Sequence, residues 1–158
     1  MHGRFRVQRM LNSDYKEMLQ ILLEEGVEFI IVGAYALAAH GYPRATGDID
    51  IWIKPDADNA RKVLRSLNRF GTPLYSLSEN DLTVQGTVFQ IGVIPRRIDI
   101  LTSITGVNFD DAWKDCLQVE IDGLIIPVLS REKLIANKEA IGRDKDVIDV
   151  KNLRKRNM

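Results

Sequence analysis

The sequence has very few cysteines and histidines, the residues that form disulfides, zinc sites and thiol nucleophiles. Among its 158 residues are one cysteine, Cys116, and two histidines, His2 and His40. A single cysteine excludes a disulfide within the chain and is typical of a reducing compartment. A zinc site, which draws on several cysteines and histidines, is not expected. No histidine lies near Cys116 in the sequence, so we interpret its thiol as structural rather than as a nucleophile.

Long apolar runs and an excess of one charge are also missing. No segment approaches the roughly 18 apolar residues that a membrane-spanning helix needs, and the N-terminus lacks the apolar core of a signal peptide. The 22 basic residues balance the 22 acidic residues, so the net charge does not indicate a nucleic-acid-binding protein. We therefore expect a cytoplasmic protein that does not contact a membrane.

What the chain does have is the composition of an ordinary globular domain. Hydrophobic residues make up 45% of it and charged residues 28%, a balance that argues against disorder. The length fits one domain with its own hydrophobic core. We predict a single domain over residues 1–158, in which residues 1–11 can be flexible.

Helical periodicity and strand-like runs succeed each other along the chain. Apolar spacing and capping residues predict helices over residues 13–24, 34–40, 56–70, 130–141 and 144–154. Apolar or alternating runs predict strands over residues 27–32, 48–54, 88–93, 97–102, 117–121 and 124–128. Ser13 is expected to cap the first helix, and Asp122-Gly123 to form a tight type I′ turn. This order indicates an α+β fold with a mixed β-sheet flanked by helices.

Asp48 and Asp50 are the most informative acidic residues. They open the run Asp-Ile-Asp-Ile-Trp-Ile, and alternation along a strand puts both carboxylates on one face. Trp52 shares that face, where it can either stack on a base or pack in the core. The opposite, buried face receives Ile49, Ile51 and Ile53. Two converging carboxylates repel each other unless a cation offsets their charge, so we predict that Asp48 and Asp50 bind Mg²⁺ or Mn²⁺.

A third acid, Asp99, lies between Ile98 and Ile100 in another expected strand. If this strand neighbours the first, Asp99 completes a cluster of three carboxylates. Such a cluster suits phosphoryl-type chemistry, because two metal ions can bind the attacking and the leaving oxygens. Asp99 could also help to deprotonate the attacking hydroxyl. The alternative is that a single aspartate between isoleucines simply faces water.

Gly33 stands between an expected strand and an expected helix. A glycine there lets the backbone approach a phosphate closely, and the helix N-terminus offers free N–H donors. We therefore predict that a triphosphate lies between the turn at Gly33 and the metal. Gly33 could also serve only as a tight turn, which does not exclude the phosphate role.

These residues resemble a known superfamily. Gly33-Ala34, Asp48-Ile49-Asp50 and Asp99 are similar to the motifs of nucleotidyltransferases with the DNA polymerase β-like fold. Residues 44–50, Arg-Ala-Thr-Gly-Asp-Ile-Asp, resemble the Arg-x-Thr-x-Asp-Ile-Asp stretch of the AbiEii-like branch, which includes toxins of toxin–antitoxin systems. The resemblance extends from about Val27 to Leu153. It implies a nucleotidyltransferase-like mixed β-sheet flanked by helices, with catalytic and metal-binding roles for the three aspartates.

The C-terminal part carries a second similarity to that branch. Lys138 is followed by Arg143-Asp144-Lys145-Asp146 and then by Asp149, as in the branch pattern of a lysine, Arg-x-Lys-Asp and another aspartate. The resemblance implies that Lys138 contacts the nucleotide. The alternative is that these charges lie on a helix surface and pair locally.

The sequence departs from the wider superfamily after the glycine. Many members have a serine there, whose hydroxyl can contact a phosphate, whereas this chain has Ala34. Basic residues can supply the missing contact. We expect the nucleotide to be bound by Gly33, Ala34, Arg44 and Lys138. For Arg44, pairing with a local acid is equally open.

The resulting hypothesis is a Mg²⁺-dependent nucleotidyltransferase. It would move a nucleoside monophosphate from a nucleoside triphosphate to an acceptor hydroxyl and release pyrophosphate. The acceptor could be RNA, a protein or a small molecule, and the resemblance adds an antitoxin as a partner. Two alternatives stay open. One is a non-catalytic module of the same fold that binds a nucleotide or a partner, and the other is a phosphohydrolase that uses the same metals.

Overall fold

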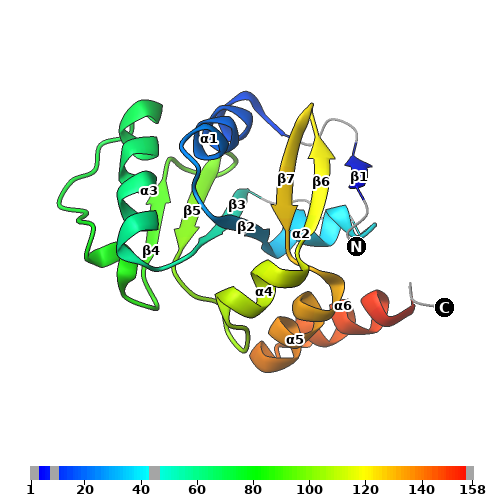
Figure 1. Cartoon of the computed structure of the whole chain (residues 1–158). Coiled ribbons are helices and arrows are strands. Elements are labelled where there is room, and N and C mark those ends of the chain that lie inside the picture. The colour runs from blue at the N-terminus through cyan, green and yellow to red at the C-terminus, as the bar shows by residue number, and fades with distance from the viewer. Residues whose placement is uncertain (1–3, 8–10, 43–46, 156–158) are drawn as a thin grey trace.

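One mixed sheet runs through the protein (Figure 1). In the computed structural model, residues 4–7, 11–42 and 47–155 are described. Within them the strands are β1 (Arg4–Val7), β2 (Phe29–Val32), β3 (Asp48–Ile53), β4 (Val88–Ile91), β5 (Arg97–Leu101), β6 (Leu117–Ile121) and β7 (Leu124–Val128). Their order across the sheet is β1-β6-β7-β2-β3-β5-β4. The pairs β1/β6, β2/β7 and β3/β5 are parallel and the others antiparallel, which confirms the predicted mixed sheet.

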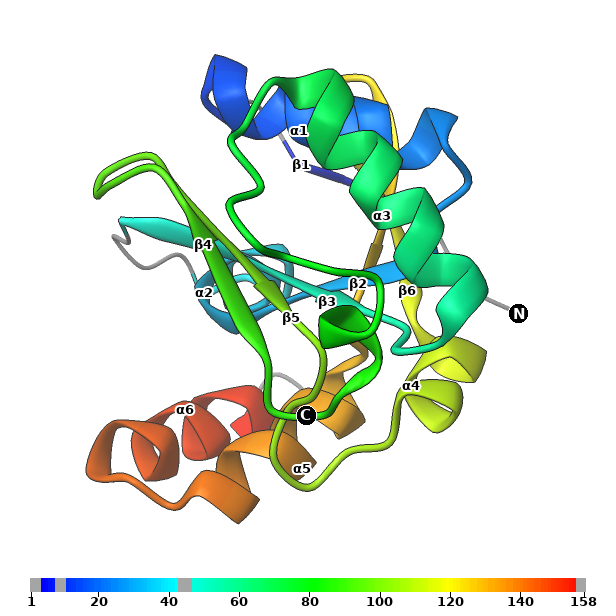
Figure 2. The same cartoon turned by 90° about the vertical axis from the view of Figure 1, so that its left-hand side faces the viewer.

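Helices flank the sheet on two sides. They are α1 (Ser13–Glu24), α2 (Gly33–Ala39), α3 (Ala57–Phe70), the short 3₁₀ helix η1 (Asp81–Thr83), α4 (Phe109–Asp115), α5 (Arg131–Ile141) and α6 (Asp144–Lys155). Helices α1 and α3 pack side by side on one side of the sheet, and α5 and α6 pair on the other side (Figure 2). This arrangement confirms the α+β class. Among the described residues, no helix has the length and apolar character needed to cross a membrane.

The neighbouring strands β2 and β3 lie in the buried middle of the sheet. All four residues of β2 are buried, as expected for a continuous apolar strand that is covered on both faces. In β3 the isoleucines at positions 49, 51 and 53 are buried. Full burial of one such side chain contributes about 1.5–3 kcal/mol of transfer free energy. The buried face of β3 therefore holds rigidly the strand from which Asp48 and Asp50 project.

Side-chain caps define where several helices begin. Asn12, and not Ser13, caps α1, because its Oδ1 accepts a hydrogen bond from the backbone N–H of Tyr15 at 2.9 Å. Both residue types favour this position, so the predicted cap was wrong by one residue. Asp56 caps α3 by accepting from the N–H of Asn59, and Ser130 caps α5. These two caps agree with the sequence-based boundaries.

Strand β1 lies at one end of the sheet, and the hairpin of β6 and β7 lies next to it. Arg4–Val7, within the segment 1–11 for which flexibility is expected, form β1 and pair in parallel with β6. The flexibility of that segment stays a prediction. The hairpin of β6 and β7 is confirmed. Its turn has positive φ angles at Asp122 (51°) and Gly123 (84°), the backbone geometry that a type I′ turn requires.

Strand β5 forms a hairpin with β4 and lies next to β3 on its other side. β4 and β5 pair antiparallel, and β5 then pairs in parallel with β3. The start of β5 is held from two elements, because the N–H of Arg97 donates to the carbonyl of Gly47 and the Tyr15 hydroxyl donates to the carbonyl of Arg97. This pairing sets which residues of β5 lie beside Asp48 and Asp50.

Candidate metal centre

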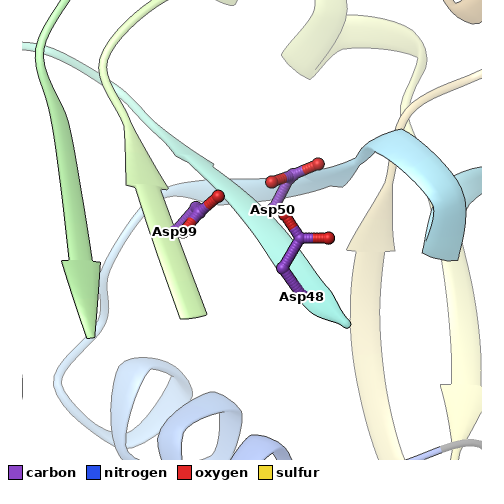
Figure 3. A group of neighbouring side chains, drawn as sticks. All are labelled: Asp48, Asp50 and Asp99. Carbon is purple, nitrogen blue, oxygen red and sulfur yellow. The ribbon is translucent and has the colours of Figure 1, made fainter. Parts of the chain in front are cut away.

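Asp48, Asp50 and Asp99 meet at one place on the sheet. Asp50 of β3 lies directly opposite Asp99 of β5, while Asp48 lies opposite Arg97. One potential ligand oxygen from each of the three carboxylates lies within 4.8 Å of the other two. Figure 3 shows the side chains of Asp48 and Asp50 projecting from β3 and that of Asp99 from the neighbouring strand. The strand pairing on which the predicted three-carboxylate cluster depended is therefore present.

The alternation of β3 explains why the first two acids are available. Asp48 and Asp50 are partly exposed, whereas the isoleucines between and after them are buried. Trp52 shares the aspartate face but is only 1% exposed, and its ring packs edge-to-face on Phe109 at a centroid distance of 5.0 Å. Core packing, and not stacking on a base, is the role that this contact gives Trp52.

Gly33 is required by the position of Asp50. Strand β2 pairs with β3 so that Val32 lies opposite Asp50, and the chain turns into α2 at Gly33 with a φ of 70°. A β carbon at Gly33 would lie 2.3 Å from Asp50 Oδ2. Any other residue would therefore have to displace the carboxylate. No side-chain hydrogen bond caps the start of α2, and the backbone of Gly33 lies beside the carboxylate of Asp50.

The carboxylates are crowded enough to perturb one another. Burial, together with the negative charges of Asp48 and Asp99, raises the pKa of Asp50 to about 7, against the opposing effect of Arg97. Burial also raises the pKa of Asp99, and Arg97 again opposes the shift. Holding all three groups ionised near neutral pH therefore calls for further positive charge.

Arg97 is a site residue that the sequence analysis missed. Its Nε donates to Asp99 Oδ1 at 3.0 Å, and one terminal nitrogen donates to Asp99 Oδ2 at 3.2 Å and to Asp48 Oδ2 at 2.9 Å. The guanidinium thus bridges two of the three acids. The available signal was its position two residues before Asp99, which places both side chains on the same face of one strand.

The oxygen cluster fits a hard divalent cation. Ligands on opposite sides of one Mg²⁺ or Ca²⁺ ion lie about 4–5 Å apart, which matches the 4.8 Å within which the carboxylate oxygens gather. Carboxylate oxygens are the donors that Mg²⁺ and Mn²⁺ prefer. A cation here would also favour the ionised form of Asp50, whose raised pKa shows the cost of negative charge at this position.

Two residues expected to bind nucleotide are not part of this cluster. Arg44 lies outside the described residues. Lys138 is buried, and its ammonium pairs with Asp149 at 3.0 Å and with Asp146 at 3.5 Å. Arg143 also pairs with Asp146. The charges of this C-terminal motif therefore pair locally, as the alternative expected. However, Lys138, Asp146 and Asp149 are buried between α5 and α6 and are not exposed on a helix surface. The contact of Lys138 with the nucleotide stays a prediction.

Comparison with known proteins agrees with this geometry. The sequence profile of a family described as "Nucleotidyltransferase of unknown function (DUF6036)" matches residues 9–156. A comparison with curated protein sequences finds no match.

Two solved structures share the fold. One is a candidate nucleotidyltransferase, TM1012 of Thermotoga maritima, with 22% identity and a TM-score of 0.58 over 93% of this chain and 94% of that one. The other is the lincosamide antibiotic adenylyltransferase LnuA, solved with lincomycin bound, with 16% identity and a TM-score of 0.56 over 92% of this chain and 98% of that one. These likenesses confirm the nucleotidyltransferase-like fold that the sequence motifs implied.

Proposed function

The chain belongs to the nucleotidyltransferase family DUF6036, and on that premise we propose that it transfers a nucleoside monophosphate from a nucleoside triphosphate to an acceptor hydroxyl with the help of Mg²⁺ or Mn²⁺. One observation carries the proposal. Asp48, Asp50 and Asp99 come from two strands and place their oxygens within 4.8 Å of one another, beside a glycine whose missing side chain leaves room for Asp50.

Each acid has a defined part in the proposed site. The carboxylates of Asp48, Asp50 and Asp99 would hold the divalent cation, which when bound neutralises the phosphate charge and favours attack on phosphorus. The absence of a side chain at Gly33 leaves room for the carboxylate of Asp50. The backbone N–H groups of Gly33 and Ala34, at the start of α2, are the proposed contacts to the triphosphate. Arg44 is proposed to add a cationic contact.

The reaction itself needs one proton acceptor. The acceptor oxygen forms a bond to the α-phosphorus, and the bond from that phosphorus to the bridging oxygen of the β-phosphate breaks. Pyrophosphate leaves with the electron pair of the broken bond, and the hydroxyl proton passes to the carboxylate of Asp99. Because Asp99 lies beside Asp50 in the register, the group that takes the proton is held next to the groups that orient the phosphate.

Loss of both Asp48 and Asp50 tests the proposal. The double variant Asp48→Asn/Asp50→Asn should no longer incorporate labelled nucleotide into the acceptor. The matched control is Asp111→Asn, which changes an exposed aspartate on α4 and should keep full activity. Incorporation by the double variant at the rate of the control would contradict the proposal. Nucleotide binding that needs neither Mg²⁺ nor these acids, without transfer, would favour the non-catalytic binding module.

The acceptor is the next question for the same assay. LnuA acts on a lincosamide antibiotic, so a small-molecule hydroxyl belongs in the trial beside RNA and protein. The AbiEii-like motifs favour a toxin that acts in the cytoplasm. For such a toxin we propose RNA or protein as the acceptor and an antitoxin as the partner. Growth arrest on expression, relieved by the Asp48→Asn/Asp50→Asn substitutions, would support that context, and unaffected growth would contradict it.

A further inference from the structure

Arg97 holds oxygen atoms that a divalent cation would need. Its guanidinium makes a two-pronged contact with Asp99, at 3.0 and 3.2 Å, and reaches Asp48 Oδ2 at 2.9 Å. Two-pronged pairs of this kind are among the strongest charge-assisted hydrogen bonds in proteins. Both oxygens of Asp99 and one oxygen of Asp48 therefore already interact with positive charge.

The arginine is built into the site and is not a loose surface pair. Its backbone N–H donates to the carbonyl of Gly47, and its carbonyl accepts from the Tyr15 hydroxyl at 3.0 Å. The adjacent Arg96 provides a contrast within the same hairpin. The side chain of Arg96 is 57% exposed and lies 3.6 Å from the carboxylate of Asp14, while that of Arg97 is 26% exposed.

A cation bound to the same oxygens would meet the charge of Arg97 at close range. With metal–oxygen bonds of about 2.1 Å and hydrogen bonds of about 3 Å, the two charges would lie about 4–5 Å apart. Even at the dielectric constant of bulk water, about 80, repulsion between a divalent ion and a unit charge at that separation corresponds to more than a tenfold change in a dissociation constant. Metal binding and the Arg97 contacts therefore oppose each other.

We propose that Arg97 is the internal counter-cation of the three-aspartate cluster and sets its affinity for the divalent ion. It holds Asp48 and Asp99 close together despite their like charges, and the ion must displace it, at least from Asp99, in order to bind. Arg97 is thus a positioning residue that makes occupancy of the site depend on the cation concentration. The inference rests on the proposed function in one respect, namely that these acids bind a divalent ion.

Calorimetric titration with Mn²⁺ alone tests this role. Removing the positive charge in Arg97→Met should lower the dissociation constant for Mn²⁺ by roughly tenfold or more, while Arg96→Met should match the wild type. Equal affinity in the wild type and Arg97→Met, or weaker binding in Arg97→Met, would overturn the inference and leave the proposed metal site intact. Absence of Mn²⁺ binding in all three proteins would instead overturn the metal site itself, and the inference with it.

A measurement on the wild type covers the case in which Arg97→Met does not fold. The Nε–H proton of Arg97, hydrogen-bonded to Asp99, should give a slowly exchanging NMR signal that Arg97→Lys lacks. Addition of Mg²⁺ should shift this signal and speed its exchange with solvent as the contact to Asp99 is lost. A signal that stays unchanged while Mg²⁺ saturates the site would show that the ion and Arg97 do not compete.

Discussion

Gly33 lies so close to the carboxylate of Asp50 that any side chain at position 33 would have to displace this carboxylate. A β carbon on Gly33 would lie 2.3 Å from Asp50 Oδ2, and the φ of 70° at Gly33 is itself unfavourable for other residues. The glycine of the superfamily motif therefore has a role besides any contact to phosphate. It leaves the space in which the carboxylate of Asp50, one of the three proposed metal ligands, lies.

Gly33→Ala should weaken Mn²⁺ binding by roughly tenfold or more, the loss typical when the support of a metal ligand is disturbed. The control is Gly26→Ala. Gly26 has a similar φ of 74°, but a β carbon there would meet no atom within 4 Å. Both variants should lose about 1–2 kcal/mol of stability for the left-handed backbone, whereas only Gly33→Ala should lose metal affinity. Equal Mn²⁺ affinity in the two variants by calorimetry would show that the space left by Gly33 is not needed for metal binding by Asp50.

The pKa of Asp50 predicts a stability profile with a defined sign. Its value is about 7 in the folded protein against an ordinary 3.8, so between about pH 4 and pH 7 the folded state binds more protons than the unfolded state. The free energy of unfolding should therefore fall as the pH rises through this window. Since one pKa unit corresponds to about 1.4 kcal/mol, the loss is on the order of a few kcal/mol.

Urea unfolding at several pH values checks this slope. Asp50→Asn removes the titrating group, so the variant should gain stability relative to the wild type as the pH rises, and the difference should level off above about pH 7. Asp111→Asn should run parallel to the wild type. Saturating Mg²⁺ should reduce the difference, because the ion favours the ionised carboxylate. A difference between the wild type and Asp50→Asn that does not vary with pH would contradict the assigned pKa.

Lys138 offers a test between a structural and a nucleotide-binding role. Lys138→Met would leave the buried carboxylates of Asp146 and Asp149 without the lysine that pairs with both. Breaking a buried pair from one side costs about 3–5 kcal/mol. Arg154→Met, which removes an exposed pair with Glu139, should cost about 0–1 kcal/mol.

Thermal unfolding and nucleotide titration of both variants separate the two roles. The buried ion pairs predict a large loss of stability for Lys138→Met with little change in nucleotide affinity of the folded fraction. Unchanged stability combined with a lost affinity for nucleoside triphosphate would instead place Lys138 at the nucleotide.

Local patterns predicted the parts of the site that depend on one strand or one turn. The alternation of the Asp48–Ile53 run predicted which side chains share a face of β3, and Asp122-Gly123 predicted the turn between β6 and β7. Asn12 and Ser13 are adjacent residues that can both cap a helix, so the sequence could not choose between them. The Arg4–Val7 strand pairs with β6, and a partner more than a hundred residues away leaves no local signal.

The parts that depend on packing between distant elements were beyond the sequence. Arg97 reaches Asp48, in addition to Asp99 on its own strand, only because β5 pairs in parallel with β3 in a register that places Arg97 opposite Asp48. Likewise, burial of Lys138 depends on how α5 meets α6. Charge alone does not distinguish such buried pairs from helix-surface pairs, because the residue types and their spacing are the same.

Asp48, Asp50 and Asp99 are proposed to hold a divalent cation. The most direct test is a crystal structure of the protein grown with Mn²⁺ and a non-hydrolysable nucleoside triphosphate, with anomalous data that locate manganese. We expect a manganese peak within about 2–2.6 Å of carboxylate oxygens of these aspartates, with the triphosphate beside it. A bound triphosphate with no manganese at the three acids, or with manganese bound elsewhere, would contradict the proposal.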